Sequence, residues 1–332
     1  MCIVNSTTDL KTFRYVVHVP AFILGLIINL VALWILCTRI RKLIESTIYM
    51  INLIFSDIFL LFSLPFKIHA EQMNGDEWHL GLMFCKFVES LYFVNTYGTI
   101  LLITLISLDR YIAIKHPFLA QMLRSPKKAV IACTVMWVCI WSASIPNYIQ
   151  AENNQTMKKC FAKFDAFWEN GAIPVSMEVI FLISAVTVSF CSIQIIRTLR
   201  RVHEERDDVN MRLSMNIITS NLVTFLFCFT PCHIAILLYF LAKQYCWKEY
   251  LDHLRGFLQI TQCLAIVNCC LDGMYYYLII KEFWKSKITR RNNLRQQATQ
   301  NVKIYFFRIF MSSPEEILRF DTVTLIRDLG ST

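Results

Sequence analysis

Seven apolar segments, separated by short polar stretches, follow one another along the 332-residue chain. Each is about 20 residues long or longer, which is the length that an α-helix needs to cross a hydrocarbon core ~30 Å thick. The segments are Tyr15–Cys37, Thr47–His69, Cys85–Ile114, Ala129–Ile149, Pro174–Ile196, Leu213–Phe240 and Phe257–Ile280. We therefore predict an all-α membrane protein, a seven-transmembrane helix bundle whose chain ends lie on opposite sides of the membrane.

Composition and segment lengths agree with a membrane bundle. The chain is 56% hydrophobic and 17% charged, whereas soluble domains have about a quarter charged residues. We predict an N-terminal segment at 1–14, the bundle at 15–280, a short amphipathic cytoplasmic helix at 281–291 and a flexible cytoplasmic tail at 292–332. The first apolar segment can span the membrane and lacks a small-residue cleavage site, so we expect it to act as its own insertion signal.

Positive charges near the segment ends predict the orientation. Flanking Lys and Arg residues number 18 on the side that carries the C-terminus and nine on the other side. Cytoplasmic loops carry the excess of Lys and Arg, so we expect an extracellular N-terminus in a multi-pass protein of the plasma membrane. The net charge of +9 then reflects this bias and attraction to anionic lipid, and we expect no nucleic-acid partner.

The third segment has a cysteine near one end and charged residues near the other. Arg110 lies 25 residues after Cys85, which in a helix separates them by ~37 Å. Charged residues at the edge of a membrane helix are costly and point to a function. We expect this helix to cross the bilayer with an oxidised outer end and a charged inner end.

Four cysteines fall on the expected outer side, namely Cys2, Cys85, Cys160 and Cys246. Exterior thiols tend to pair in a secretory compartment, and four cysteines allow three sets of pairs. We favour Cys85–Cys160, which leaves Cys2–Cys246 as the second bond. Two glycosylation sequons, which begin at Asn5 and Asn154, also fall on this side, in agreement with the orientation.

Three prolines, Pro65, Pro146 and Pro231, lie inside predicted spans. A proline removes a backbone N–H, and its ring clashes with the preceding turn, which bends the helix. Bent spans would open a cavity on one side of the bundle. Proline is also commoner in membrane helices than in soluble ones, so a purely structural role is the alternative.

An ordered series of short motifs resembles one receptor family. The motifs are Asn29, Asn52-Leu53, Asp57, Trp78–Gly81, Cys85, Asp109–Tyr111, Trp137, Pro146, Phe225–Pro231 and Asp272–Tyr276. Together they resemble the rhodopsin-like G-protein-coupled receptors. The resemblance implies a receptor rather than an enzyme, with a heterotrimeric G protein as its partner and an arrestin and a receptor kinase acting on the tail.

Four further segments carry a narrower likeness within the family. They are Ser46–Leu53, Leu123–Lys128, Asn268–Asp272 and Ile280–Phe283. These segments are most similar to the receptor for lysophosphatidylinositol and next to the receptor for kynurenic acid. The likeness implies an anionic lysophospholipid ligand, with a small aromatic carboxylate as the alternative.

Polar residues in the middle of the spans predict a buried polar site. An isolated Asp57 would be a charge in hydrocarbon, which is expensive. Asn95 and Thr99 are four residues apart on one helix face, as are Asn268 and Asp272. The resemblance implies that these five residues converge around a sodium ion, for which oxygen donors are suited. A hydrogen-bonded packing network without an ion is the alternative, and no other cofactor is expected.

The charged triplet resembles the G-protein-coupling end of the family. Asp109 is the expected partner of Arg110, with Tyr111 completing the motif. The resemblance implies that Arg110 packs against the inserted G-protein terminus in the active state. The family's acidic partner near the inner end of the sixth helix is replaced by Met211, so we expect a weaker clasp in the inactive state.

The resemblance also implies which parts of the sixth and seventh helices move. Phe229 and Pro231 would form the swivel of the sixth helix, and Tyr276 would swing inward on activation. Two residues depart from the family pattern, since Gly273 and Ser184 stand where prolines are usual. Glycine keeps flexibility without enforcing a kink.

A cation in the outer half of the second span points to an anionic ligand. Lys67 either faces the bundle or extends toward water, and Glu89 could pair with it in a purely structural role. The functional alternative is that Lys67 binds a phosphate or carboxylate as a point charge. Amine receptors of the family hold their ligand with an Asp at the position of Tyr92, so an amine ligand is not expected. The other candidate ligand-binding residues are His233, Gln259, Gln262, Lys163 and Arg255.

A transporter and a membrane hydrolase are the rival classes. A transporter would show repeated, interrupted helices around a midplane site, and a hydrolase would need a nucleophile motif or clustered metal-binding histidines. The sequence shows neither pattern. It favours a receptor that converts binding of an extracellular or membrane-derived anionic lipid into G-protein activation.

Overall fold

The structure is a computed structural model, and the residues it describes are 6–39, 45–72, 78–152, 160, 171–205 and 209–275. The chain divides into two compact units, Met1–Ile279 and Ile280–Thr332. The second unit lies outside the described residues, so the expected cytoplasmic helix at 281–291 and the tail at 292–332 stay predictions.

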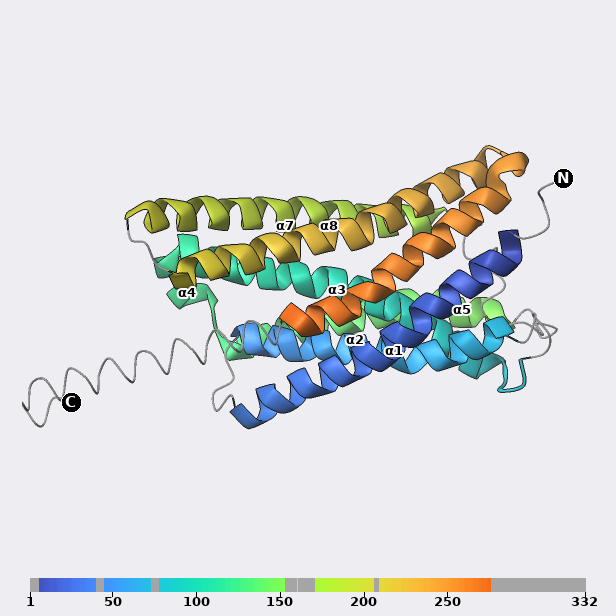
Figure 1. Cartoon of the computed structure of the whole chain (residues 1–332), viewed down its shortest axis with the longest axis horizontal. Coiled ribbons are helices and arrows are strands. Elements are labelled where there is room, and N and C mark those ends of the chain that lie inside the picture. Colours follow the sequence, from blue (N-terminus) through green and yellow to red (C-terminus); the bar gives the residue numbers. More distant parts are fainter. Residues whose placement is uncertain are drawn as a thin grey trace, which may run out of the picture. The chain divides into compact units, whose positions relative to one another are not determined.

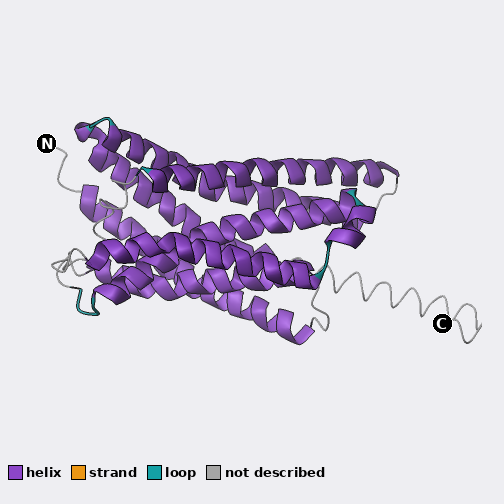
Figure 2. Cartoon of the chain, turned by 180° about the vertical axis from the view of Figure 1, so that it is seen from behind, coloured by secondary structure: helices purple, strands orange, loops and turns teal. Residues whose placement is uncertain are grey.

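The described part of the chain contains helices and no strands (Figures 1 and 2). The elements are α1 (Ser6–Arg39), α2 (Glu45–Gln72), α3 (Leu82–Lys115), α4 (Pro117–Leu123), α5 (Pro126–Glu152), α7 (Ala172–Glu205), α8 (Val209–Gln244) and the short 3-10 helix η1 (Lys248–Tyr250). Residues 251–275 follow η1 directly as a further helix, called here the last helix. Within the described ranges, seven helices are long and apolar enough to cross a membrane, which confirms the predicted bundle.

Several helices continue beyond the apolar segments that predicted them. α1 begins at Ser6 and α8 at Val209, although their apolar segments begin at Tyr15 and Leu213. Because every backbone N–H and C=O needs a hydrogen-bond partner, a helix that has formed in the hydrocarbon continues readily into polar flanks. The seven spans therefore follow from hydropathy, whereas their ends do not.

Helix α3 lies at the centre of the bundle. It packs against α2, α5 and α7, while α1 packs on α2 and α7 packs on α8. The long helices run alongside one another (Figure 1). Small residues permit the closest approach on α3, since a Cβ on Gly98 would lie 3.1 Å from Ser56 Oγ and 3.6 Å from the Trp137 ring. Trp137 in turn donates a hydrogen bond of 2.9 Å to Asn52 Oδ1.

Helix α1 and the last helix approach each other closely around a glycine. A Cβ on Gly273 would lie only 2.5 Å from Ile28 Cγ2, and Asn29 Nδ2 donates a 3.0 Å hydrogen bond to the carbonyl of Cys269. Real Cβ atoms are not found at such a distance. Gly273 thus has a packing role, whereas the sequence suggested only that it keeps flexibility without enforcing a kink.

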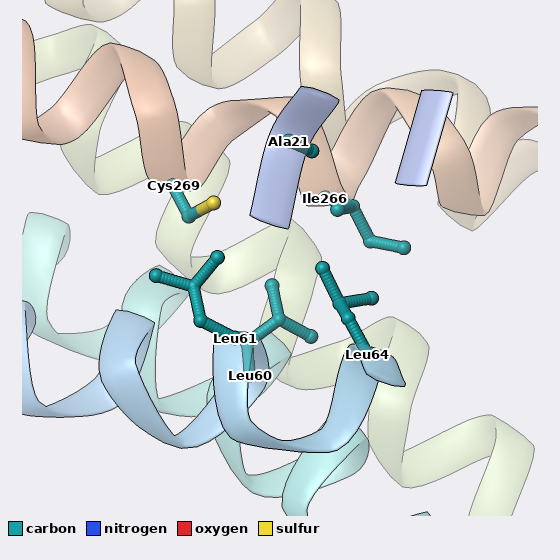
Figure 3. Close-up of a cluster of buried hydrophobic side chains, with 6 residues drawn as sticks. All are labelled: Ala21, Leu60, Leu61, Leu64, Ile266 and Cys269. Carbon is teal, nitrogen blue, oxygen red and sulfur yellow. The ribbon is translucent and has the colours of Figure 1, made fainter. Parts of the chain in front are cut away.

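A layer of apolar side chains crosses the bundle between α1, α2 and the last helix. It consists of Ala21, Leu60, Leu61, Leu64, Ile266 and Cys269. Figure 3 shows the leucines of α2 directed toward Ile266 and Cys269 of the last helix, with Ala21 of α1 alongside. Each of the six is at most 5% exposed. This group is called the apolar layer below.

One of the two expected disulfides is present. Cys85 and Cys160 are bonded, with their Cα atoms 5.7 Å apart, which confirms that pair. Cys246 carries a free, exposed thiol, so the expected Cys2–Cys246 bond is not formed at that residue, which lies in a tight turn with φ 55. Cys2 and the sequon residues Asn5 and Asn154 lie outside the described residues.

Candidate functional site

Helical periodicity places polar residues on both sides of the apolar layer. Residues three or four apart stay on one face of a helix, about one turn from each other. Toward the end of the bundle that carries Cys85, His18 precedes Ala21 by three positions and Lys67 follows Leu64 by three. Toward the end that carries Asp109, Asp57 precedes Leu60 by three positions and Asp272 follows Cys269 by three. These are called the Cys85 end and the Asp109 end.

The carboxylate layer contains the five residues predicted to converge in the middle of the bundle, namely Asp57, Asn95, Thr99, Asn268 and Asp272, and all are buried. Asn268 Nδ2 donates a 2.6 Å hydrogen bond to Asp272 Oδ2, and Asn95 Nδ2 lies 3.4 Å from Thr99 Oγ1. Asp57 interacts with the Asn95 side chain and electrostatically with Asp272. The structure thus brings Asp57, Asn95 and Asp272 together.

The donor atoms of this layer fit a hard monovalent cation. Asp57 Oδ2 and Asn268 Oδ1 are buried and have no hydrogen-bond partner. A buried polar oxygen without a partner is costly, and two neighbouring carboxylates repel each other in a medium of low dielectric. A cation bound by carboxylate, amide and hydroxyl oxygens would remove both costs. These residues could therefore hold a sodium ion.

Lys67 points into the bundle at the Cys85 end. Its Nζ lies 4.6 Å from the centre of the Tyr92 ring, and Tyr92 packs against the apolar layer. The Tyr92 hydroxyl is buried and lacks a hydrogen-bond partner. A cation and an unsatisfied hydroxyl at one level are suited to binding a polar ligand group.

Glu89 has a cationic partner that the sequence did not suggest. Its carboxylate accepts a 2.9 Å hydrogen bond from Lys86, the residue three positions before it on α3. Lys86 is buried, and it was expected only to flank the span. The Glu89 carboxylate also lies beside the Cys85–Cys160 bond. This ion pair links neighbouring turns of α3 next to the disulfide.

His233 on α8 is enclosed by residues of α3 and α7 on the other side of the bundle. Its Nδ1 lies 3.1 Å from Glu178 Oε1 on α7, and its ring stacks on Phe181 with centroids 3.9 Å apart. The Tyr97 ring meets it edge-on at 5.9 Å. Both the Tyr97 hydroxyl and His233 Nε2 are buried without a hydrogen-bond partner. Glu178 was not predicted as a site residue, although it is a lone acid inside an apolar span and such residues are often functional.

The remaining candidate ligand residues lie mostly on the last helix. Gln262 is buried, while Gln259 and Arg255 are partly buried on the same side of that helix. Spacings of three and four residues align them along one face. Lys163 lies outside the described residues. The side chains that the structure places near the Cys85 end thus come from α1, α2, α3, α7, α8 and the last helix.

At the Asp109 end, an arginine from the following loop holds the motif. Arg124 donates hydrogen bonds of 2.7 and 3.0 Å to the two carboxylate oxygens of Asp109, and Ser46 on α2 donates a third of 2.8 Å. Glu45 lies 3.5 Å from Arg124. The hydrogen bond to Asp109 raises the pKa of Arg124, so this residue stays charged. The sequence predicted Arg110 as the partner and missed Arg124.

The expected swivel residues are buried in α8. Phe229 is 2% exposed, and its ring packs at 5.4 Å on Phe225. Pro231 lies inside the same helix. Thr224 lies five residues before Phe229 in α8, nearer the Asp109 end. Its hydroxyl is 2.6 Å from the Tyr275 hydroxyl of the last helix. Tyr276 and the side chain of Met211 lie outside the described residues.

The bundle has seven spanning helices, inward-facing polar side chains at one end, buried carboxylates in its middle and an Asp-Arg-Tyr motif at the other end. This arrangement is that of a seven-transmembrane receptor. The family profile described as "7 transmembrane receptor (rhodopsin family)" matches residues 28–276. The chain belongs to this family.

Curated relatives match over most of their length. The chain is 32% identical to lysophosphatidic acid receptor 6 of Gallus gallus, over 90% of this chain and 98% of the relative. It is 34% identical to G-protein coupled receptor 55 of Homo sapiens, over 91% and 94% respectively, and 32% identical to G-protein coupled receptor 35 of Homo sapiens, over 79% and 82%. The family comprises multi-pass membrane receptors rather than enzymes, and the transporter alternative has no support.

Proposed function

We propose that the protein is a G-protein-coupled receptor whose ligand is an anionic lysophospholipid of the lysophosphatidylinositol type. The observation that carries this proposal is Lys67, a cation directed into the bundle and seated on the Tyr92 ring 4.6 Å away. A phosphate group can pair with that ammonium while the acyl chain lies among apolar side chains. A relative named lysophosphatidic acid receptor 6 supports the same ligand class.

The absence of an acid at the amine-binding position also supports an anionic ligand. Tyr92 occupies that place on α3, and a nearby acid on α3, Glu89, is already paired with Lys86 at 2.9 Å. An ammonium ligand would then meet Lys67 as a like charge, which is unfavourable in a partly desolvated site. A negatively charged ligand meets the opposite sign.

Signalling would proceed from the Cys85 end, outside the cell, to the Asp109 end, inside it. Ligand binding would rearrange the contacts of α3, α8 and the last helix around the swivel at Phe229 and Pro231. The Asp109 end would then open for a heterotrimeric G protein, with Arg110 against its inserted terminus. A sodium ion held by Asp57 and Asp272 would supply positive charge that stabilises the inactive packing.

A small aromatic carboxylate such as kynurenic acid is the second candidate ligand. The observation in its favour is the set of rings beside the polar groups, since Phe181 and Tyr97 both contact His233. Aromatic rings stack well on such surfaces. The same Lys67 ammonium would bind the carboxylate, so only a direct comparison of the ligands separates the two candidates.

The test is GTP exchange by purified G proteins with the receptor in lipid nanodiscs. Lysophosphatidylinositol should stimulate exchange, and Lys67→Ala should lower its potency by about 10- to 100-fold, as expected for loss of a charge-assisted contact. Lys243→Ala is the matched control, because Lys243 also lies over a tyrosine ring, at 5.6 Å from Tyr239. Equal potency in Lys67→Ala and wild type would contradict the proposed binding role.

Recruitment of an arrestin and a receptor kinase to the tail is proposed on the same basis. The candidate phosphate acceptors are Ser312, Ser313, Thr322 and Thr324, all outside the described residues. Phosphate groups there would create clustered negative charge, which arrestin-type partners recognise through basic side chains. A chain ending before residue 292 should still activate a G protein and lose ligand-dependent arrestin binding.

A further inference from the structure

The link between α4 and α5 consists of two residues, Arg124 and Ser125. Ser125 is partly exposed, and the proline and two lysines that follow it are exposed. We infer that Ser125 is phosphorylated by a protein kinase that selects a proline after the acceptor, and that the phosphate releases α4 from α3. This inference goes beyond the proposed function and shares with it only the cytoplasmic position of the Asp109 end, where ATP is available.

The sequence distinguishes Ser125 from the other acceptors that precede a proline. The Ser-Pro and Thr-Pro pairs of the chain begin at Ser125, Thr230 and Ser313. Thr230 lies inside the spanning helix α8, and two acids follow the proline after Ser313. Ser125 has a lysine, Lys128, at the third position after it. An acidic substrate groove in a kinase would therefore attract the segment around Ser125 and repel the one around Ser313.

The backbone around Ser125 can be presented to an enzyme. Arg124 is extended, with φ −82° and ψ 124°, and a residue that precedes a proline is disfavoured in the α region. The preceding helix α4 has seven residues and none of them is buried. A helix of that length is marginal without tertiary contacts, so local opening of α4 would expose the segment before Ser125.

Ser125 lies between two basic residues whose side chains hold the end of α4. Arg124 donates hydrogen bonds of 2.7 and 3.0 Å to the carboxylate of Asp109 on α3. Lys128 Nζ donates a hydrogen bond of 2.9 Å to the carbonyl of Met122 in α4. A new anion on Ser125 would thus appear beside both cations.

Phosphorylation would add that anion by transfer from ATP. A bond forms between Ser125 Oγ and the γ-phosphorus, while the bond from that phosphorus to the β,γ-bridging oxygen breaks and ADP leaves. The hydroxyl proton passes to a carboxylate of the kinase. The product carries about −1.5 to −2 charge near pH 7 and three acceptor oxygens, whereas a carboxylate carries a single charge.

Arg124 can exchange its present partner for the phosphate. Its side chain is 27% exposed, and consecutive Cα atoms are about 3.8 Å apart, which is less than the reach of an arginine side chain. Asp109 would keep the 2.8 Å hydrogen bond that Ser46 donates. The charge-assisted bonds to the phosphate would therefore replace those to Asp109 without leaving the buried carboxylate unpaired.

Repulsion favours release of α4 over a shared site. Glu45 lies 3.5 Å from Arg124, so a phosphate that approached the Asp109 carboxylate would meet two like charges in a partly desolvated place. The phosphate and the arginine would instead move together away from α2 and α3. Because His116 alone separates α3 from α4, the surface beside the Asp-Arg-Tyr motif would change as well.

The first measurement tests the modification. Receptor in nanodiscs is incubated with ATP and a cyclin-dependent protein kinase, which is proline-directed and selects a base at the third position after the acceptor. Mass spectrometry of its peptides should find a phosphate on Ser125 in wild type and none there in Ser125→Ala. Lys128→Gln should slow the modification by about 10-fold, as expected for loss of a charged contact. Wild type without phosphate on Ser125 would overturn the inference.

The second measurement tests release of α4 by hydrogen exchange in the same protein before and after the kinase reaction. The amides of Ala120 and Arg124, which donate to carbonyls one turn earlier at 2.9 Å, should exchange about 10-fold faster or more once phosphorylated. Arg124→Gln should show the faster exchange without the kinase, and its phosphorylation should add little. Ser125→Ala is the matched control and should keep the slow exchange.

The outcomes are independent of the ligand, because neither measurement requires one. Phosphate on Ser125 with unchanged exchange in α4 would overturn the release. A large further increase on phosphorylation of Arg124→Gln would show that the phosphate does not act through Arg124, and would also overturn it. Failure of every lysophospholipid to stimulate GTP exchange would contradict the proposed function and leave these results as they are.

Discussion

At the scale of single residues, the chain shows how a family position can be reused for packing. Gly273 stands where a proline is usual, and a Cβ there would lie 2.5 Å from Ile28 Cγ2. Proline would place a whole ring in that space. The glycine allows α1 and the last helix to approach, and this approach lets Asn29 reach the carbonyl of Cys269 at 3.0 Å. Backbone contact between helices thus depends on one missing side chain.

Gly273→Ala should therefore destabilise the protein. An overpacked methyl group at this contact costs about 1–3 kcal/mol, which should appear as a lower Tm in a detergent or nanodisc melting experiment. Adding Ile28→Ala should recover most of the loss by making room. Gly256→Ala is the control, because a Cβ at Gly256 would meet Leu10 at an ordinary 3.7 Å. An unchanged Tm for Gly273→Ala would contradict the close approach.

At the scale of elements, a hydrogen bond joins the two helices that the resemblance implies must separate. The hydroxyls of Thr224 on α8 and Tyr275 on the last helix are 2.6 Å apart. Outward movement of the Asp109 end of α8 about the swivel at Pro231 would break this contact. The bond stabilises the arrangement in which α8 and the last helix are together.

Tyr275→Phe and Thr224→Val should each raise GTP exchange without ligand. A hydrogen bond between neutral groups contributes about 0.5–1.5 kcal/mol, which corresponds to about a 2- to 10-fold shift toward the open arrangement. Because both substitutions remove the same bond, the double variant should resemble either single one. Thr187→Val is the control, since Thr187 bonds to Ile183 in its own helix. Additive increases would show that the two hydroxyls act independently.

Some of the helices and their contacts could be predicted from the sequence, and others could not. Hydropathy predicted the seven spans, helical periodicity placed Asn268 and Asp272 on one face, and the family resemblance implied that Asp57 and Asp272 come together. Adjacent residues on a helix do not face each other, and Arg124, the partner that bonds both oxygens of Asp109, lies 15 residues further along the chain, where nothing in the sequence marked it as a partner. Glu178 was missed because the rotation of α7, which turns it toward His233, depends on contacts between distant segments.

At the scale of the whole molecule, charge alternates along the bundle. Lys67 lies above the apolar layer, toward the Cys85 end, and the carboxylates of Asp57 and Asp272 lie below it, toward the Asp109 end. Opposite charges on the two sides attract each other across a medium of low dielectric. An anion that binds above would neutralise the charge of Lys67 and so change the field at the two carboxylates below, which gives a physical route for coupling the ligand site to the middle of the bundle.

If a sodium ion occupies the carboxylate layer, sodium should stabilise the ligand-free protein. A cation that binds only the folded state contributes about 1 kcal/mol at a concentration several times its Kd. The wild-type Tm should then be higher in sodium chloride than in N-methyl-D-glucamine chloride at equal ionic strength, and Asp57→Asn or Asp272→Asn should abolish the difference. Glu178→Gln removes another carboxylate of the bundle and should leave it intact. A wild-type Tm that is the same in both salts would favour the packing network without an ion, because the buried oxygens of Asp57 and Asn268 would then be satisfied by protons or water.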